Sequence, residues 1–268
     1  MIFYFSGTGN TRWAARHTAA AIGDTPSDIV ALLKNSNDDE PLRFDLAEDE
    51  ALGFFFPVHG WRPPRIVKEF IKRLHVEYAD NHYCYVVCTA GDTVGEAEDI
   101  FEKDVAARGI HVDSAISLIM PESYVGLPFM DVDKVAKERQ KKDVATKRLE
   151  KFVGDIKQRR RGIHDIHTGR WPRINSRLIG EAFVRWTITD RPFHVVTDRC
   201  IGCGKCTSVC PVEDIRLNND RHPEWLHNGN CLTCFACYHH CPTHAIEFGG
   251  RTKKKGQYYF EKAEKTEK

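Results

Sequence analysis

The sequence has 268 residues, of which 41% are hydrophobic and 29% charged, and its formal net charge is +1 at pH 7. At about 150 residues per domain this length predicts two domains. The near-neutral charge gives no argument for a nucleic-acid partner or an anionic membrane surface, and no apolar run reaches the roughly 18 residues needed to cross a bilayer.

Strand-like and helix-like segments alternate along residues 1–161. The β-rich run 2–5 leads into an alanine-rich helical segment at 11–21, and the alternation then continues. The expected strands are 2–5, 28–31, 51–58, 83–89 and 112–119, and the expected helices are 11–21, 63–74, 95–108 and 132–156. This alternation predicts an α/β domain with a parallel sheet covered by helices on both faces.

The rest of the chain divides into three parts. Residues 162–192 form a bridge whose apolar residues recur at helical spacing, which predicts a packed helix rather than a loose tether. Residues 193–250 repeat a unit of strand, cysteine loop, short helix and strand, which predicts a small α+β domain. Residues 251–268 are a basic, lysine-rich tail, and we expect it to fray beyond Phe260.

The first expected strand ends in a loop of glycines and short polar residues. The loop consists of Ser6, Gly7, Thr8, Gly9, Asn10 and Thr11. Its backbone amides, its hydroxyls and the N-terminus of the following helix can bind a phosphate monoester without a lysine. Arg12 occupies the third glycine position of a dinucleotide fingerprint, and the loop has no Gly-Lys-Ser/Thr. The loop therefore predicts a monophosphate site rather than an NAD or nucleoside triphosphate site.

Two copies of the spacing Cys-x2-Cys-x2-Cys-x3-Cys-Pro lie near the C-terminus. This is the run of bacterial ferredoxins, in which three cysteines hold one cubane and the fourth ligates the other. On that pattern cluster I takes Cys200, Cys203, Cys206 and Cys241, and cluster II takes Cys231, Cys234, Cys237 and Cys210. Zinc sites use paired CxxC motifs or cysteine with histidine, so the duplicated runs favour two [4Fe–4S] clusters over zinc or disulfides.

The phosphate loop and the cysteine runs together carry a resemblance to a known family. Residues 6–11 match the FMN phosphate loop of flavodoxins, (T/S)-x-T-G-x-T, and the chain over residues 1–250 resembles the fused flavodoxin–ferredoxin proteins of the EFR1 family. The resemblance implies a flavodoxin-like, doubly wound parallel sheet of order 2-1-3-4-5 with FMN at the switch point. It also implies a ferredoxin-like domain with two [4Fe–4S] clusters.

The same resemblance implies two further loops at the flavin ring. The first contains Pro57, His59, Gly60 and Trp61, and the second contains Thr89, Ala90, Gly91 and Asp92. Trp61 either stacks on the flavin or packs against the next helix, and the Gly60 carbonyl is a candidate acceptor for reduced N5. Since the second loop lacks an aromatic residue, one flavin face can be open to a neighbour, although Tyr124 is a candidate to cover it.

Cys84 and Cys88 fall on one face of the expected strand 83–89, where we expect buried thiols without a redox role. No signal-peptide pattern opens the chain, and thiolate ligands must stay reduced, so we expect a cytoplasmic protein.

Two functions are consistent with these features. The first is electron transfer between the clusters and FMN, which couples one-electron transfer to two-electron transfer. The second is a reductase in which FMN reduces a small organic acceptor such as a quinone, an enone or a nitro compound. The expected partner is a redox protein or a small electron acceptor, without nucleic acid or a membrane. The sequence shows no catalytic acid–base pair, so whether the chain is a carrier or an enzyme stays open.

Overall fold

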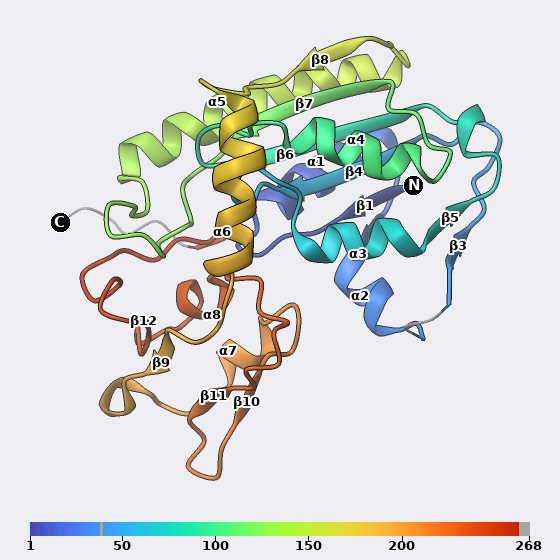
Figure 1. The fold of residues 1–268 in the computed structure, drawn as a ribbon. Coiled ribbons are helices and arrows are strands. Elements are labelled where there is room, and N and C mark those ends of the chain that lie inside the picture. Colours follow the sequence, from blue (N-terminus) through green and yellow to red (C-terminus); the bar gives the residue numbers. More distant parts are fainter. Residues whose placement is uncertain (38–39, 263–268) are drawn as a thin grey trace.

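The computed structural model describes residues 1–37 and 40–262 (Figure 1). The N-terminal domain contains β1 (Ile2–Tyr4), α1 (Asn10–Ile22), β2 (Pro26–Asp28), α2 (Ile29–Lys34), β3 (Leu42–Phe44), β4 (Leu52–Pro57), α3 (Arg65–Arg73), β5 (Leu74–Val76), β6 (Cys84–Ala90), α4 (Ala97–Ala106), β7 (Ser114–Ile119), α5 (Val135–Lys157) and β8 (Ile163–Asp165). A π-helical segment (Ile174–Ile179) continues into α6 (Gly180–Trp186). The C-terminal domain contains β9 (Phe193–Val195), α7 (Lys205–Ser208), β10 (Ile215–Leu217), β11 (Pro223–Trp225), α8 (Ala236–His239) and β12 (Ile246–Phe248).

Six parallel strands form the central sheet of the N-terminal domain in the order β2-β1-β4-β6-β7-β8. Counted along the chain within this sheet, the order is 2-1-3-4-5-6. The predicted flavodoxin-like fold class is confirmed, with β8 as an additional edge strand that the sequence analysis placed in the bridge.

Alternating residues of β4 fill the cores on the two faces of the sheet. Phe54 and Phe56 pack with residues of α2, α3 and α4. Phe55 points to the other face and packs with residues of α1 and α5. The continuous apolar run of β4 is therefore explained by burial on both faces, as expected for a central parallel strand.

The expected strand at 28–31 is wrong in its boundaries. The strand is β2, which ends at Asp28, and α2 begins at the next residue. The Asp28 carboxylate accepts a hydrogen bond from the Val30 backbone N–H at 2.9 Å, so Asp28 is an N-cap that starts the helix. Leu74 was also assigned to the wrong element: it opens β5, which pairs with β3 outside the main sheet.

The C-terminal domain repeats one unit twice, as expected. The first copy is β9, α7 and β10, and the second is β11, α8 and β12. The antiparallel pairs join β9 to β12 and β10 to β11. Its small core packs Phe193, Phe235 and Phe248 among the cysteine side chains, so the cysteine loops are part of the core.

The bridge and the tail both join the two domains. In Figure 1, α6 spans from the sheet domain to the cysteine-rich domain. The tail returns to the first domain, where the Phe260 ring stacks on Trp13 at 5.1 Å and the Phe260 N–H donates to the Thr8 carbonyl at 2.9 Å. Of the tail expected to fray, residues 263–268 lie outside the described residues. Within the described ranges, no helix is both long and apolar enough to cross a membrane.

Candidate functional site

The predicted phosphate loop connects β1 to the N-terminus of α1. The Gly9 N–H donates to the Ser6 hydroxyl at 3.1 Å, and Gly9 has a left-handed φ of 97° that glycine adopts without strain. Thr11 and Thr89 share a hydroxyl–hydroxyl hydrogen bond of 2.7 Å. The loop is thus held by its own Ser6 side chain and by Thr89 of β6, with the positive end of the α1 dipole behind it.

A cavity of about 410 Å³ opens where the parallel strands end. It is lined by the predicted flavin-site residues with the exception of Gly9, namely Ser6, Gly7, Thr8, Asn10, Thr11, Pro57, His59, Gly60, Trp61, Thr89, Ala90, Gly91 and Asp92. The volume is within the range of cofactor pockets. The structure therefore brings all three predicted flavin loops to one space at the switch point of the sheet.

The first flavin loop is a tight two-residue turn. His59 and Arg62 exchange backbone hydrogen bonds of 3.0 and 3.2 Å, and Gly60 and Trp61 both have positive φ, as in a type I′ turn. The Trp61 indole N–H donates to the Thr93 hydroxyl at 3.0 Å, which fixes the ring at the cavity wall. Burial lowers the pKa of His59 to about 4, so its imidazole is neutral at pH 7.

The second flavin loop adjoins a carboxylate that the sequence analysis missed. One Glu122 oxygen, Oε1, accepts the N–H groups of Ser123 and Tyr124 at 2.9 and 2.8 Å. The other, Oε2, faces Gly91 so closely that a β-carbon on Gly91 would collide with it. Burial raises the pKa of Glu122. Its position in the loop that follows the end of β7 is the signal that could have identified it.

The far wall of the cavity comes from the bridge, from the loop after β7 and from the second cysteine run. The added lining residues are Val58, Thr93, Pro121, Glu122, Ser123, Tyr124, Leu127, Phe129, Met130, Ile179, Phe183, Ile188, Thr233 and Cys234. Tyr124, a candidate to cover the ring, contacts Phe183 and Phe235 at centroid distances of 5.4 and 5.3 Å. The bridge helix was predicted, but its role as a wall of this cavity was not.

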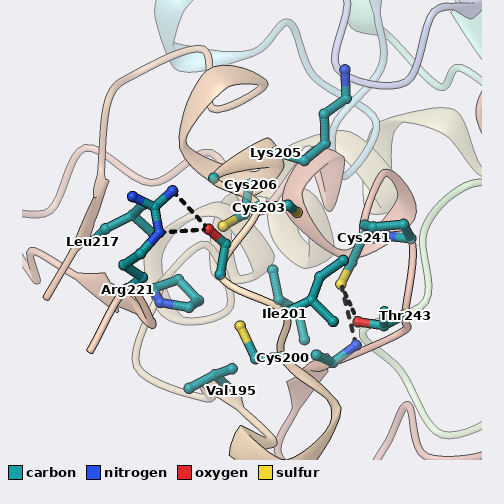
Figure 2. Close-up of a pocket in the computed structure, with 16 residues that line it drawn as sticks. Val195, Cys200, Ile201, Cys203, Lys205, Cys206, Leu217, Arg221, Cys241 and Thr243 are labelled. Atoms are coloured by element: carbon teal, nitrogen blue, oxygen red, sulfur yellow. Dashed lines mark hydrogen bonds between the residues drawn. The ribbon is translucent and has the colours of Figure 1, made fainter. Parts of the chain in front are cut away.

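The structure brings the four cysteines of each predicted cluster together. One cavity is lined by Cys200, Cys203, Cys206 and Cys241 (Figure 2), and a second by Cys210, Cys231, Cys234 and Cys237. These are the sets expected for cluster I and cluster II, including the crossed fourth cysteine of each.

The described cysteine sulfurs are not grouped as tightly as a single tetrahedral ion requires. A tetrahedral zinc ion with Zn–S bonds of about 2.3 Å holds its four sulfurs roughly 3.8 Å apart. Among the described residues, no three cysteine sulfurs lie within 4.8 Å of one another. Backbone N–H groups also point at the sulfurs: Ala245 donates to Cys241 at 3.2 Å and Asp214 to Cys210 at 3.3 Å. Such donors stabilise the negative charge of a thiolate-bound cluster.

Cys234 belongs to two cavities at once. It lines both the cluster II cavity and the flavin cavity. A β-carbon placed on Gly7 would lie 2.9 Å from the Cys234 β-carbon. The cysteine run and the phosphate loop are therefore in direct contact, and Gly7 allows that contact.

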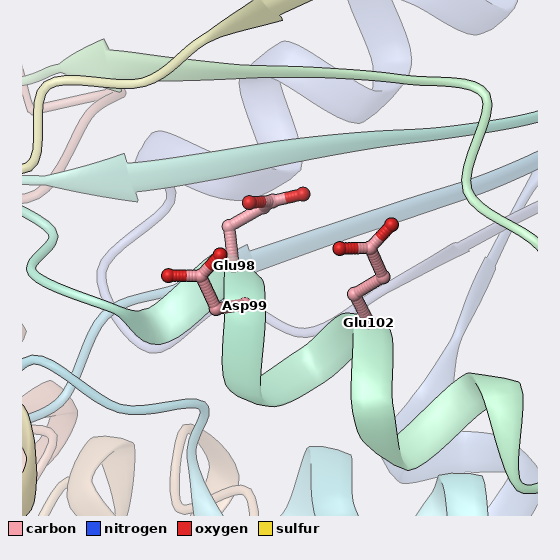
Figure 3. Close-up of side chains that lie close together, drawn as sticks. All are labelled: Glu98, Asp99 and Glu102. Atoms are coloured by element: carbon pink, nitrogen blue, oxygen red, sulfur yellow. The ribbon is translucent and has the colours of Figure 1, made fainter.

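Two other groups of reactive side chains lie apart from these cavities. Cys84 and Cys88 are fully buried in β6, and burial raises the pKa of both thiols. Glu98, Asp99 and Glu102 gather on α4 (Figure 3). Glu98 is only 5% exposed, and its Oε1 lies 3.6 Å from the His164 Nδ1. We assign neither group a role in binding.

Comparison with known proteins identifies the C-terminal domain. Residues 194–242 match the 4Fe-4S dicluster domain family. The chain is 35% identical over 57 residues to an uncharacterized ferredoxin of Methanocaldococcus jannaschii and covers 74% of that protein, but the match takes only 20% of this chain. The chain belongs to the dicluster ferredoxin family. The chain is also 37% identical over 68 residues to the formate dehydrogenase iron-sulfur subunit of Haemophilus influenzae, a match that covers 22% of this chain and 20% of that subunit.

Two solved structures are similar to part of this chain. Both are provisionally described as flavoproteins, from Bacteroides uniformis and Bacteroides eggerthii. The first is 22% identical with a TM-score of 0.34, over 44% of this chain and 88% of the other. The second is 16% identical with a TM-score of 0.32, over 54% and 96%. At these scores the flavodoxin-like assignment rests on the strand order of the chain itself.

Proposed function

We propose that this protein carries electrons between two [4Fe–4S] clusters and FMN. One observation carries the proposal: Cys234, a ligand expected for cluster II, also lines the cavity formed by the phosphate loop. Ferredoxin clusters transfer single electrons. A cluster held against a flavin site can exchange electrons over a short distance, without a diffusional encounter between two proteins.

The residues around the cavity fit FMN. The phosphate loop offers amides and hydroxyls to a dianionic monophosphate at the N-terminus of α1. Backbone amides of the Ala90–Gly91 segment can contact the polar edge of the ring, since neither residue has a bulky side chain. When bound, FMN supplies the step between one-electron and two-electron chemistry.

The two clusters have different places in this arrangement. Cluster II lies at the interface with the flavin cavity through Cys234. The cluster I cavity contains no flavin-site residue and is bounded by the outer part of the ferredoxin domain, including Leu217 and Arg221. We therefore propose the order cluster I, cluster II, FMN for the electron path, in either direction.

A second candidate function is supported by the apolar wall of the cavity. Phe129, Ile179 and Phe183 extend the lining beyond the three flavin loops, and Phe129 is 83% exposed. This wall could hold an uncharged organic acceptor beside the flavin. In that case the protein is a reductase, with the same internal electron path.

Cofactor analysis and one matched pair of variants test the proposal. We expect about eight irons and one FMN per chain after anaerobic reconstitution. Cys234→Ser should slow electron exchange between cluster and flavin more than Cys203→Ser, because only Cys234 lies at the flavin cavity. Rapid-mixing spectroscopy follows the iron–sulfur and flavin absorption separately. Bound zinc, the absence of FMN, or equal rates in the two variants would contradict the proposal.

A further inference from the structure

The flavin cavity opens to solvent between apolar side chains. Phe129 and Ile179 line the cavity and yet are exposed, at 83% and 47%, so they lie where it opens. Phe183, which also lines the cavity, follows Ile179 by one helical turn on the bridge. These three side chains are here named the apolar mouth. A ligand that covers them removes apolar surface from water, which favours its binding.

The segment that carries Phe129 is held at both ends by the tail. The Lys255 ammonium donates to the Val125 carbonyl at 3.0 Å, and the Gly256 N–H donates to the Asp131 side chain at 2.9 Å. Phe129 lies in a turn between these two anchors. The ring is therefore presented by a held turn, so that a ligand can contact it without first ordering a loose loop.

Aromatic rings gather in and behind the apolar mouth. Trp61 and Tyr124 line the cavity together with Phe129 and Phe183. Tyr124 and Phe183 meet edge to face, with their centroids 5.4 Å apart. Aromatic side chains pack well against flat conjugated molecules, by stacking or by edge-to-face contact. The lining therefore favours a ligand with a flat conjugated ring over a small aliphatic one.

The charges around the cavity favour an uncharged ligand at the apolar mouth. Asp92 and Glu122, at the second flavin loop, are the charged side chains among the described residues that line the cavity. Lys141 donates to the Gly91 carbonyl at 2.7 Å, but it is paired with Asp133 at 2.6 Å. The phosphate loop can bind an anion through its amides, whereas the mouth consists of apolar side chains. An anionic group placed there would lose its hydration without gaining a cationic partner.

We propose that the apolar mouth binds a flat, uncharged acceptor of the quinone class, which is reduced by the adjoining FMN. The inference rests on the second candidate function, because it needs a bound flavin and clusters that supply it with electrons. Conversion of a quinone to a hydroquinone consumes two electrons and two protons. A one-electron donor supplies the electrons singly through the clusters, FMN passes both to the quinone, and water supplies the protons. A quinone needs only the electrons that one flavin holds, whereas full reduction of a nitro group needs more.

Binding of menadione, an uncharged naphthoquinone, to the fully oxidised reconstituted chain tests the site. An oxidised flavin cannot reduce it, so the change in flavin absorption gives a dissociation constant without turnover. We expect this constant to rise roughly tenfold in Phe129→Ala and severalfold in Ile179→Ala. Leu178→Ala and Tyr78→Ala are the matched controls and should leave it unchanged, because both side chains are exposed and neither lines the cavity. A naphthoquinone sulfonate, which adds a negative charge to the same ring, should bind roughly tenfold more weakly than menadione.

The outcomes separate this proposal from the proposed function. Missing clusters or FMN in the unmodified protein would refute the proposed function. With intact cofactors, equal menadione affinity in Phe129→Ala and Tyr78→Ala, or equal affinity for the sulfonate, would refute only the quinone site. Reduction of menadione by the dithionite-reduced protein no faster than by free reduced FMN would also overturn it. So would a dimer that dissociates in Phe129→Ala, because the mouth would then belong to a second copy of the chain.

Discussion

Replacing Gly7 with alanine should disturb the contact between the phosphate loop and cluster II. The φ of Gly7 is not left-handed, so the backbone itself accepts an alanine. The added methyl group would meet the Cys234 β-carbon at 2.9 Å and the Cys234 sulfur and carbonyl oxygen at 3.5 Å. A β-carbon cannot rotate away as the end of a long side chain can, so the two loops must move apart.

The expected size of this effect follows from the packing. Overpacking a close contact destabilises a protein by about 1–3 kcal/mol. Because the strained residues line the flavin cavity, we expect part of this energy to appear as weaker FMN binding, by roughly tenfold for each 1.4 kcal/mol. The rest should appear as slower electron exchange between cluster II and the flavin.

Fluorescence titration gives the FMN dissociation constant, and denaturant unfolding of the apoprotein gives the stability. Gly154→Ala is the control, since a β-carbon at this position in α5 meets nothing within 4 Å and alanine favours a helix over glycine by about 1 kcal/mol. The control should be as stable as the unmodified chain or more so. If the Gly7→Ala variant binds FMN and exchanges electrons like the unmodified chain, the inferred direct contact between the phosphate loop and the cysteine run is refuted.

Three further substitutions test other parts of the structure. Glu122→Gln removes a carboxylate beside Gly91 and should raise the flavin midpoint potential at pH 8 by roughly 30 mV, about 1.4 kcal/mol for two electrons; an unchanged potential in a spectroelectrochemical titration would place this group away from the ring. Tyr258→Phe deletes the 2.6 Å hydrogen bond to the Asn10 side chain and should weaken FMN binding by about 1 kcal/mol. If the same fluorescence titration gives equal FMN affinity, the tail does not influence the phosphate loop. Burial raises the pKa of Glu98 to about 7, so its contribution to stability is full below about pH 4.5 and is lost as the pH rises through 7. Urea unfolding should therefore show Glu98→Gln gaining stability relative to the unmodified chain between pH 5 and pH 8, and a constant difference would contradict the raised pKa.

The parts of the site that could be predicted are those encoded by local spacing. The residues of the phosphate loop follow one another directly between a strand and a helix, and the cysteine runs fix three sulfurs on one short loop. The phosphate loop and the cysteine runs can therefore be recognised in the sequence without knowledge of the tertiary structure. The sheet was predictable for a similar reason, because a central strand such as β4 must be apolar on both faces.

The missed features depend on contacts between distant segments. Phe183 reaches the flavin cavity only because Gly60 has no side chain at the point of contact, and no local pattern marks that pair. The same holds for Cys234 and Gly7. The error at β2 had a local cause: Asp28 is a helix N-cap, but the β-branched residues Ile29 and Val30 that follow it favour a strand.

These contacts make the two domains a single binding unit rather than two tethered carriers. A flexible linker alone would raise the effective concentration of one domain near the other but would not fix their distance. In this protein the two domains are in contact at several points. The bridge supplies a cavity wall, Cys234 packs on the phosphate loop, and His239 joins the tail to the loop after β7 by accepting from the Tyr258 N–H at 3.1 Å and donating to the Ser123 carbonyl at 2.7 Å. The first domain without the rest of the chain would therefore lose one wall of its own flavin cavity. FMN affinity should depend on the ferredoxin domain even though that domain contributes few groups to the cavity.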